Sequence, residues 1–142
     1  MTRDEIQKLI DEFVSAWTAQ NLERLLGCYG ETAELVSPLL HTQRGIDAIE
    51  RAHQDLFLAF ADNVLDVHDV VVDVEGQQAV LVFTLNATQH GEFHGFPASG
   101  RRTNTQCAFV MQFRNGRIVS ERRLYDYGGF LMQLGILKTR SM

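Results

Sequence analysis

The sequence predicts an α+β fold in which N-terminal helices pack on one face of an antiparallel sheet. Apolar residues recur every three or four positions up to residue 60, which is typical of helices, and every second position from residue 63 onward, which is typical of strands. The pair Asn115–Gly116 is a strong β-hairpin signal in the second part. Because long strands crossed by helices can curl, we expect a strongly curved, cone-shaped sheet around an interior pocket.

Three helices are expected in the first part of the chain. Thr2 and Glu5 form a capping box before the first helix, whose apolar stripe ends at Trp17. Asn21 caps a second, shorter helix that stops at Gly27. A short strand over 33–36 and a loop then lead to a third helix, whose apolar stripe runs from residue 46 to residue 60.

The second part reads as a meander. The predicted strands cover residues 67–74, 79–88, 103–113 and 117–125, and a short helix ending at Gly135 follows them. Residues 89–100 are rich in Gly and His and contain Pro97, so we expect an irregular connection there.

Length and composition indicate a single folded domain over residues 1–142. Hydrophobic residues make up 45% of the chain, which is too many for a disordered protein, and no apolar run approaches the roughly 20 residues of a membrane-spanning helix. The N-terminus is charged where a signal peptide would be apolar. We therefore expect a cytoplasmic protein that binds no membrane.

The charged residues and the cysteines exclude further classes. The net charge is −5 and the basic residues are dispersed, so nucleic acid is not an expected partner. Cys28 and Cys107 lie far apart and have no C-x-x-C spacing, which indicates neither a disulfide framework nor a zinc ribbon.

Two stretches of the second part resemble the SnoaL-like polyketide cyclase family. Residues 91–101 read G-E-F-H-G-F-P-A-S-G-R and fit the family pattern G-x-F-x-G-x-P-x-[ST]-G-R. The family ending D/N-G-[KR]-I…D…Q-L-G is matched by residues 115–118, Asp126 and residues 133–135. The resemblance implies a nuclear-transport-factor-2-like cone, a homodimer, a pocket for a small hydrophobic molecule, and ring closure by intramolecular aldol condensation without a cofactor.

Asp126 is the leading candidate for a catalytic residue, because the matching aspartate of the cyclases is their acid/base. If Asn115–Gly116 is a two-residue turn, Asp126 lies opposite Thr105 on the apolar face that also carries Phe109. Burial there would raise the pKa of the carboxyl toward neutrality. The alternative is an N-cap, since a short helix follows Asp126 directly.

The other candidates are ligand-binding residues. Arg122 shares the predicted inner face with Asp126, where it could orient a carbonyl or an anion. The histidine that partners the aspartate in the cyclases is absent, because no histidine follows His94. Further candidates are aromatic residues that could line the cavity and histidines that could contact a ligand: Trp17, Tyr29, His41, His90 and His94.

Several alternatives stay open. His90 and His94 do not form the H-E-x-x-H pattern, in which a helix aligns two histidines on one metal ion, so we expect no metal site. His53 falls on the apolar stripe of the third helix and is expected to be a hydrogen-bonded core residue. Ser37 stands before Pro38, where the related ketosteroid isomerases have a general-base aspartate, so that base is missing and a ketosteroid isomerase is disfavoured. Three functions stay open: a cofactor-free cyclase or isomerase-type enzyme that uses Asp126, a non-catalytic ligand-binding protein, and an interaction module.

Overall fold

A computed structural model describes residues 1–138 as four helices and six strands. The helices are α1 (Arg3–Thr18), α2 (Leu22–Leu26), α3 (Ile46–Ala59) and α4 (Tyr127–Gln133). The strands are β1 (Tyr29–Ser37), β2 (His41–Arg44), β3 (Val64–Asp73), β4 (Gln78–Thr88), β5 (Arg102–Arg114) and β6 (Arg117–Tyr125).

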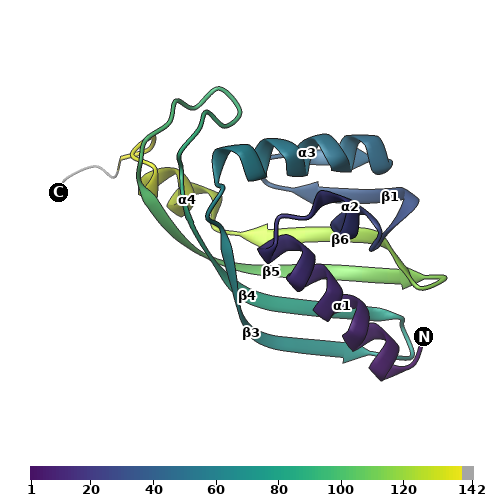
Figure 1. The fold of residues 1–142 in the computed structure, drawn as a ribbon. Helices are drawn as coiled ribbons and strands as arrows, with labels where there is room; N and C mark the ends of the chain where they lie inside the picture. The colour runs from purple at the N-terminus through teal and green to yellow at the C-terminus, as the bar shows by residue number, and fades with distance from the viewer. Residues whose placement is uncertain (139–142) are drawn as a thin grey trace.

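The strands form one curled sheet in the order β2-β1-β6-β5-β4-β3, and α1, α2 and α3 cover one of its faces (Figure 1). Neighbouring strands are antiparallel except β1 and β6, which run parallel. The predicted α+β fold is confirmed. One element was missed, since the edge strand β2 lies where we expected a loop.

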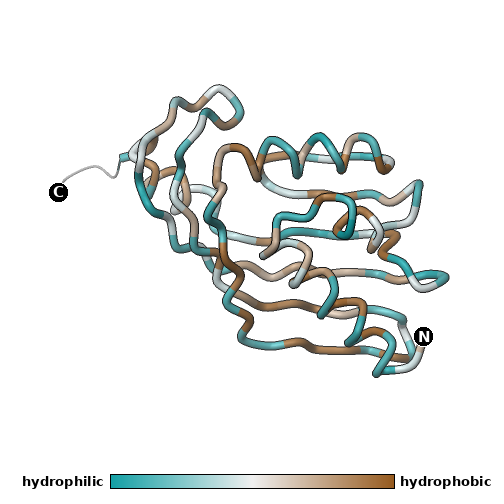
Figure 2. The backbone as a smooth tube through the Cα atoms, viewed as in Figure 1, coloured by the Kyte–Doolittle hydropathy of each residue, from teal (hydrophilic) through white to brown (hydrophobic). Residues whose placement is uncertain are grey.

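The predicted local signals are present at the helix ends. Thr2 and Glu5 form the capping box of α1, and the Asn21 side chain accepts a hydrogen bond from the backbone N–H of Arg24 at the start of α2. Figure 2 shows that both helices and strands carry hydrophobic and hydrophilic residues in turn, as elements with one buried face must. Among residues 1–138, no helix is long and apolar enough to cross a membrane.

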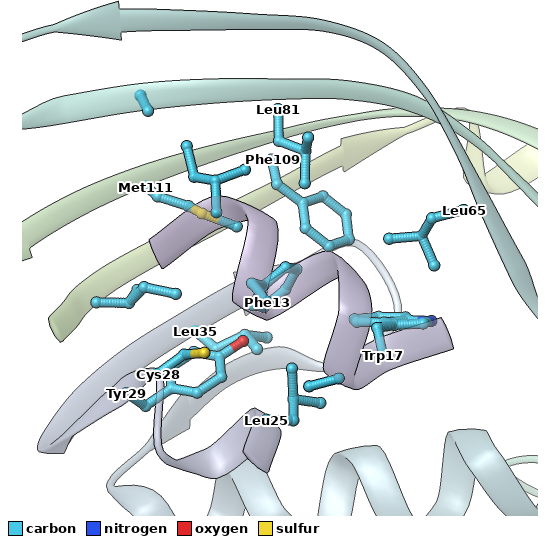
Figure 3. Close-up of a cluster of buried hydrophobic side chains, with 14 of the residues drawn as sticks. Phe13, Trp17, Leu25, Cys28, Tyr29, Leu35, Leu65, Leu81, Phe109 and Met111 are labelled. Atoms are coloured by element: carbon cyan, nitrogen blue, oxygen red, sulfur yellow. The ribbon is translucent and has the colours of Figure 1, made fainter. Parts of the chain in front are cut away.

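The main core fills the space between α1 and the covered face of the sheet (Figure 3). Phe13 is its centre, with ring centroids 5.7 Å from Trp17, 6.2 Å from Tyr29 and 6.4 Å from Phe109. A second, smaller cluster of buried residues joins the end of α3 to the connection between β4 and β5 and to the end of α4, and it contains Ala59, Phe60, Ala87, Phe93 and Leu134.

The last hairpin contains the feature that positions the candidate site. Asn115 and Gly116 both have positive φ, at 53° and 74°, as a two-residue turn of type I′ requires. The pairing Phe113↔Ile118 has the predicted register, but a bulge then shifts it, so that Gln112 pairs with Ser120 and Val119 is left over. Beyond the bulge the odd-numbered residues of β6 face the interior.

Candidate functional site

An interior cavity of about 70 Å³ lies between α3, the covered face of β4, β5 and β6, and the connection from β4 to β5. Most of its wall is apolar and comes from elements far apart in the sequence, including Trp17, Leu56, Phe60, Phe93, Phe109 and Phe130. The volume is smaller than the roughly 300–1,000 Å³ of pockets that bind drug-sized ligands. In this conformation the cavity therefore suits a small molecule.

Arg123 is the only charged residue among the described residues that line the cavity. It lies on β6 beyond the bulge, is 5% exposed, and its side chain belongs to a buried polar cluster. Its Nε donates to Glu121 Oε2 at 2.5 Å, and its Nη2 lies 2.7 Å from His53 Nε2 and donates to the Tyr29 hydroxyl at 3.4 Å. The Tyr29 hydroxyl donates to Glu121 Oε1 at 2.6 Å, which closes the cluster.

The hydrogen bonds fix the tautomer of His53. Its Nδ1 lies 2.8 Å from the Ile49 carbonyl, which can only accept, so Nδ1 carries the proton and Nε2 accepts from Arg123. Burial, reinforced by the Arg123 charge, lowers the pKa of His53 to about 3. His53 is therefore neutral in the folded protein, and the prediction of a hydrogen-bonded core histidine is confirmed.

The cluster keeps Arg123 charged. Burial acts to lower the pKa of the guanidinium, but the Glu121 carboxylate and the Tyr29 hydroxyl outweigh it and raise the pKa above its usual value. Burial, together with the Glu121 charge, raises the pKa of Tyr29 well above 10. The guanidinium also lies 5.1 Å from the Trp17 ring centroid and 4.7 Å from that of Phe109, so the cation is held by rings as well as by hydrogen bonds.

Two polar groups at the cavity wall are left without partners. A guanidinium has five N–H donors, and the hydrogen bonds of Arg123 to the described residues use only Nε and Nη2, so both N–H groups of Nη1 remain free. Thr105 Oγ1 is the one buried side-chain oxygen or nitrogen within residues 1–138 that makes no hydrogen bond. Because buried polar groups in native proteins are nearly always paired, the unpaired Thr105 Oγ1 points to a polar ligand atom. The N–H groups of Arg123 Nη1, which is not among the fully buried atoms, are free to donate to the same atom.

The remaining titratable side chains of the wall are neutral at physiological pH. Burial raises the pKa of the Cys107 thiol to about 12. Burial also raises the pKa of the Tyr125 hydroxyl, although Ser37 and the Leu39 backbone oppose part of this shift. The wall thus offers one cation and several neutral hydrogen-bonding groups.

Asp126 does not lie where the sequence analysis placed it. The bulge pairs Tyr125 with Cys107, so the predicted pairing of Asp126 with Thr105 is wrong, and Asp126 is exposed. Its carboxylate accepts the backbone N–H of Gly129 at 2.9 Å and caps α4. It also borders a second, more polar pocket of about 230 Å³, together with Thr105, Gln106 and Gln133.

The bulge affects Arg122 in the same way. The residue is exposed and stands between Glu121 and Arg123, which face inward, so the predicted inner position of Arg122 is wrong. A strand turns successive side chains to opposite faces. One extra residue therefore reverses the faces of all residues that follow it, so that Arg123 points inward and Arg122 outward. The charged residue that the sequence analysis looked for inside is Arg123.

The other candidates divide into buried and exposed groups. Trp17 lines the cavity, and its indole N–H donates to Asn63 Oδ1. Tyr29 is buried in the core, where its hydroxyl is used by Glu121. His41, His90 and His94 are all exposed, and none of them lines the cavity.

The sequence analysis missed the functional pattern of β6. Glu121, Arg123 and Tyr125 alternate in a predicted strand, which is the spacing of residues on one face. Acidic and basic residues two positions apart in a strand share one face, but the pattern does not tell whether that face is buried. Within residues 1–138, no group of three or more His, Cys, Asp or Glu side chains is placed to hold a metal ion.

Comparison with known proteins decides the family. The profile described as SnoaL-like polyketide cyclase matches residues 7–134. This chain belongs to that family. No curated protein matches the sequence of this SnoaL-like protein.

Solved structures agree with the family assignment. TsrD from Streptomyces laurentii is 27% identical and covers 96% of this chain and 99% of its own, with a TM-score of 0.84. IdmH from Streptomyces antibioticus, named as a proposed polyketide cyclase, is 24% identical over 92% of this chain and 98% of its own, with a TM-score of 0.77. A nuclear-transport-factor-2-like protein of unknown function from Burkholderia pseudomallei is 18% identical and covers 94% of this chain and 98% of its own, with a TM-score of 0.79. The SnoaL-like chain therefore has the nuclear-transport-factor-2-like fold.

Proposed function

We propose that the cavity binds a small hydrophobic carbonyl compound and that Arg123 holds its oxygen. The observation that carries the proposal is the pair of free polar groups in an apolar wall, Arg123 Nη1 and Thr105 Oγ1. A carbonyl oxygen accepts hydrogen bonds from both kinds of group, and the rest of such a ligand can contact the surrounding aromatic and aliphatic side chains.

Such a site can promote chemistry at the carbon next to the carbonyl. A fixed guanidinium in a mostly apolar cavity stabilises the negative charge that develops on the oxygen when an α-proton leaves. Ring closure by aldol condensation and isomerisation both begin with that step, and ring closure fits the description of the family to which the chain belongs. This proposed chemistry is acid/base catalysis by the residues of the chain, without a cofactor.

A second candidate is a ligand-binding protein that performs no reaction. Among the described residues that line the cavity, no carboxylate or imidazole is present to accept the proton. Glu121 and His53 lie behind the wall, but their acceptor atoms already accept hydrogen bonds from Tyr29 and Arg123. Asp126 stays the candidate base of the first alternative, and it would have to leave its position as the cap of α4.

Exchange of the α-protons of acetophenone in D2O, followed by NMR, tests the proposal without knowledge of the natural ligand. Binding is read in a separate sample in H2O, because D2O would erase the signal, from the indole N–H of Trp17, which is the only tryptophan of the chain and lines the cavity. We expect acetophenone to shift this signal and its exchange to accelerate. Arg123→Met should abolish both effects, whereas Arg122→Met, a matched change on the exposed face, should preserve them.

The outcomes separate the candidates. Binding without exchange favours the non-catalytic protein, and no binding contradicts the proposal. Asp126→Asn tests the base, because asparagine also caps a helix well but carries no carboxylate. If exchange persists in Asp126→Asn, Asp126 is not the base; if it is lost while the melting temperature is unchanged, the catalytic role predicted for Asp126 gains direct support.

We also propose that the protein is a homodimer, joined through the outer face of the sheet. That face carries exposed apolar side chains: Val71 is 60% exposed on β3 and Leu124 is 49% exposed on β6. Exposed apolar residues gathered on one face indicate an interaction surface. Light scattering on the protein as it elutes from a size-exclusion column should give twice the mass of the chain. A monomer at micromolar concentration would contradict the proposal.

A further inference from the structure

We infer that Glu121 makes the cavity selective for neutral ligands over anions, by balancing the charge of Arg123 from behind. The inference rests on the proposed function, since it concerns the ligand of the same cavity. Glu121 does not line the cavity itself, so it acts through Arg123 as a residue that determines specificity.

The charges of the buried cluster sum to zero. Arg123 carries one positive charge and Glu121 one negative charge, and both are buried, at 5% and 0% exposure. His53 donates its Nδ1 proton to a carbonyl and accepts at Nε2, and the Tyr29 hydroxyl donates to Glu121, so both of these residues are neutral. The guanidinium therefore has its counter-ion before any ligand arrives.

An anionic ligand would upset this balance. It would have to lose its water inside a low-dielectric wall, and the attraction of Arg123 would be opposed by the repulsion of Glu121 close behind it. No other described residue of the wall carries a positive charge to compensate. Two buried anions sharing one cation are unfavourable, whereas Arg123 and Glu121 alone form a complete pair.

A neutral oxygen avoids that cost and still satisfies the cavity. It can accept from the free Nη1 of Arg123 and from Thr105 Oγ1 without adding charge. Hydrogen bonds to a charged donor are among the stronger ones, so a ketone, ester or aldehyde gains affinity over a hydrocarbon of the same shape. The cavity therefore favours neutral carbonyl compounds over carboxylates.

Three probes of closely similar size and planar shape test the inference. Acetophenone has a neutral acceptor, benzoate has a negative charge, and α-methylstyrene has no acceptor oxygen. Titration of each into the wild-type protein, read at the Trp17 indole N–H signal, gives three dissociation constants. We expect acetophenone to bind about tenfold or more tightly than either of the others. Benzoate binding as tightly as acetophenone would overturn the inference.

The variant Glu121→Gln sharpens the test. Glutamine is nearly isosteric and can still accept hydrogen bonds, but it leaves the charge of Arg123 unbalanced. We expect the ratio of benzoate affinity to acetophenone affinity to rise about tenfold or more. Glu121→Asp, which keeps the charge, should preserve the wild-type order, and a purely structural role of Glu121 would change all three affinities together and leave the ratio as it was.

The failures of the two proposals can be told apart. If none of the three probes binds to the wild-type protein, the proposed function is wrong. If acetophenone and benzoate bind equally well, the cavity binds ligands but Glu121 does not select them. Should Glu121→Gln fail to fold, the wild-type comparison of the three probes still decides the inference.

Discussion

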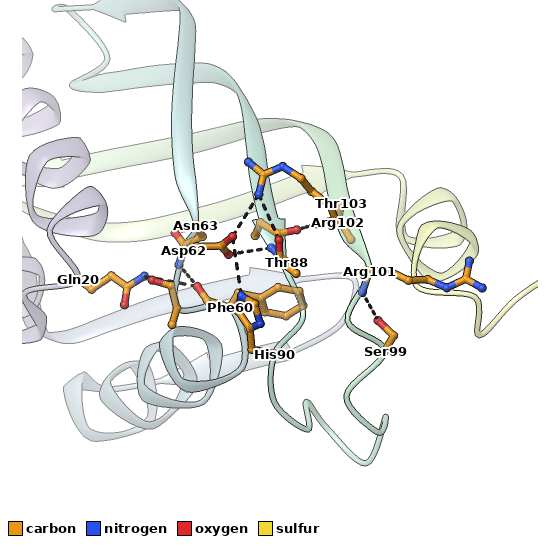
Figure 4. Close-up of polar contacts among 12 residues, drawn as sticks. Gln20, Phe60, Asp62, Asn63, Thr88, His90, Ser99, Arg101, Arg102 and Thr103 are labelled. Atoms are coloured by element: carbon orange, nitrogen blue, oxygen red, sulfur yellow. Dashed lines mark hydrogen bonds and ion pairs between the residues drawn. The ribbon is translucent and has the colours of Figure 1, made fainter.

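Two clusters in this protein each combine a carboxylate, an arginine and a histidine, one inside and one on the surface. Glu121, Arg123 and His53 are buried beside the cavity. On the surface, Arg102 Nη1 lies 3.1 Å and His90 Nε2 lies 4.0 Å from Asp62 Oδ2 (Figure 4).

Burial makes these similar sets of residues do different work. The surface cluster ties the turn after α3 to the end of β4, where the backbone N–H of Thr88 donates to Asp62 and lowers its pKa. Water surrounds it and can replace each contact. In the buried cluster Arg123 and Glu121 are only 5% and 0% exposed, so a lost partner leaves a buried charge and each group depends on the others. The comparison teaches that the chemistry of a charged group here is set by the face of the sheet it occupies.

The largest effect should come from breaking the buried pair. Arg123→Met leaves Glu121 buried without its cation, which typically costs about 3–5 kcal/mol of unfolding free energy. The double variant Glu121→Leu/Arg123→Met removes both charges and should recover part of that loss. Urea unfolding measures each value. A cost for Arg123→Met no larger than that for Arg102→Met would show that the buried cluster does not differ from the surface one.

The second effect concerns pH and His53. The pKa of His53 is about 3 in the folded protein and about 6.5 in the unfolded chain. Between these values the unfolded chain binds a proton that the folded protein does not, so stability falls as the pH falls, by up to about 1.4 kcal/mol per pH unit.

The matched variants isolate this contribution. His53→Gln removes the titrating group from the core, and the decline in melting temperature from pH 6.5 to pH 4 should become shallower than in the wild type. His90→Gln makes the same change in the exposed cluster and is the matched control for the substitution itself. Equal slopes for His53→Gln and the wild type would refute the assignment.

The smallest effect belongs to the surface cluster. Arg102→Met removes an exposed ion pair and should cost at most about 1 kcal/mol. Raising the ionic strength from about 0.1 M to about 1 M shortens the screening length from about 10 Å to about 3 Å, so the cost should shrink with salt. The cost of Arg123→Met should not change with salt, and a parallel decrease would mean that water reaches the buried pair.

The sequence was sufficient for features that depend on neighbouring residues. The capping box at Thr2, the cap at Asn21 and the turn at Asn115–Gly116 were predicted because each is formed within a few positions. The two motifs within residues 91–135 indicated the family, which the profile match confirms. The edge strand β2 was missed, because its four residues form a strand only by pairing with β1.

The candidate site was only partly predictable. Trp17 was expected at the cavity and lies there, and His53 was expected in the core and lies there. Asp126 and Arg122 were placed inside on the assumption that the register of the hairpin continues unchanged to its end. That assumption holds at Ile118 and fails at Ser120.

The sequence by itself determined the order of the elements other than β2, their periodicity and their caps, because these follow from local backbone preferences and side-chain spacing. Only the tertiary structure decided which face of β6 is inside. The bulge at Val119 lies where β6 also meets β1, and the β1–β6 pairing shifts its register between Tyr29 and Glu34 at the same place. A register fixed by two neighbouring strands cannot be read from one turn, because one extra residue reverses every side chain that follows.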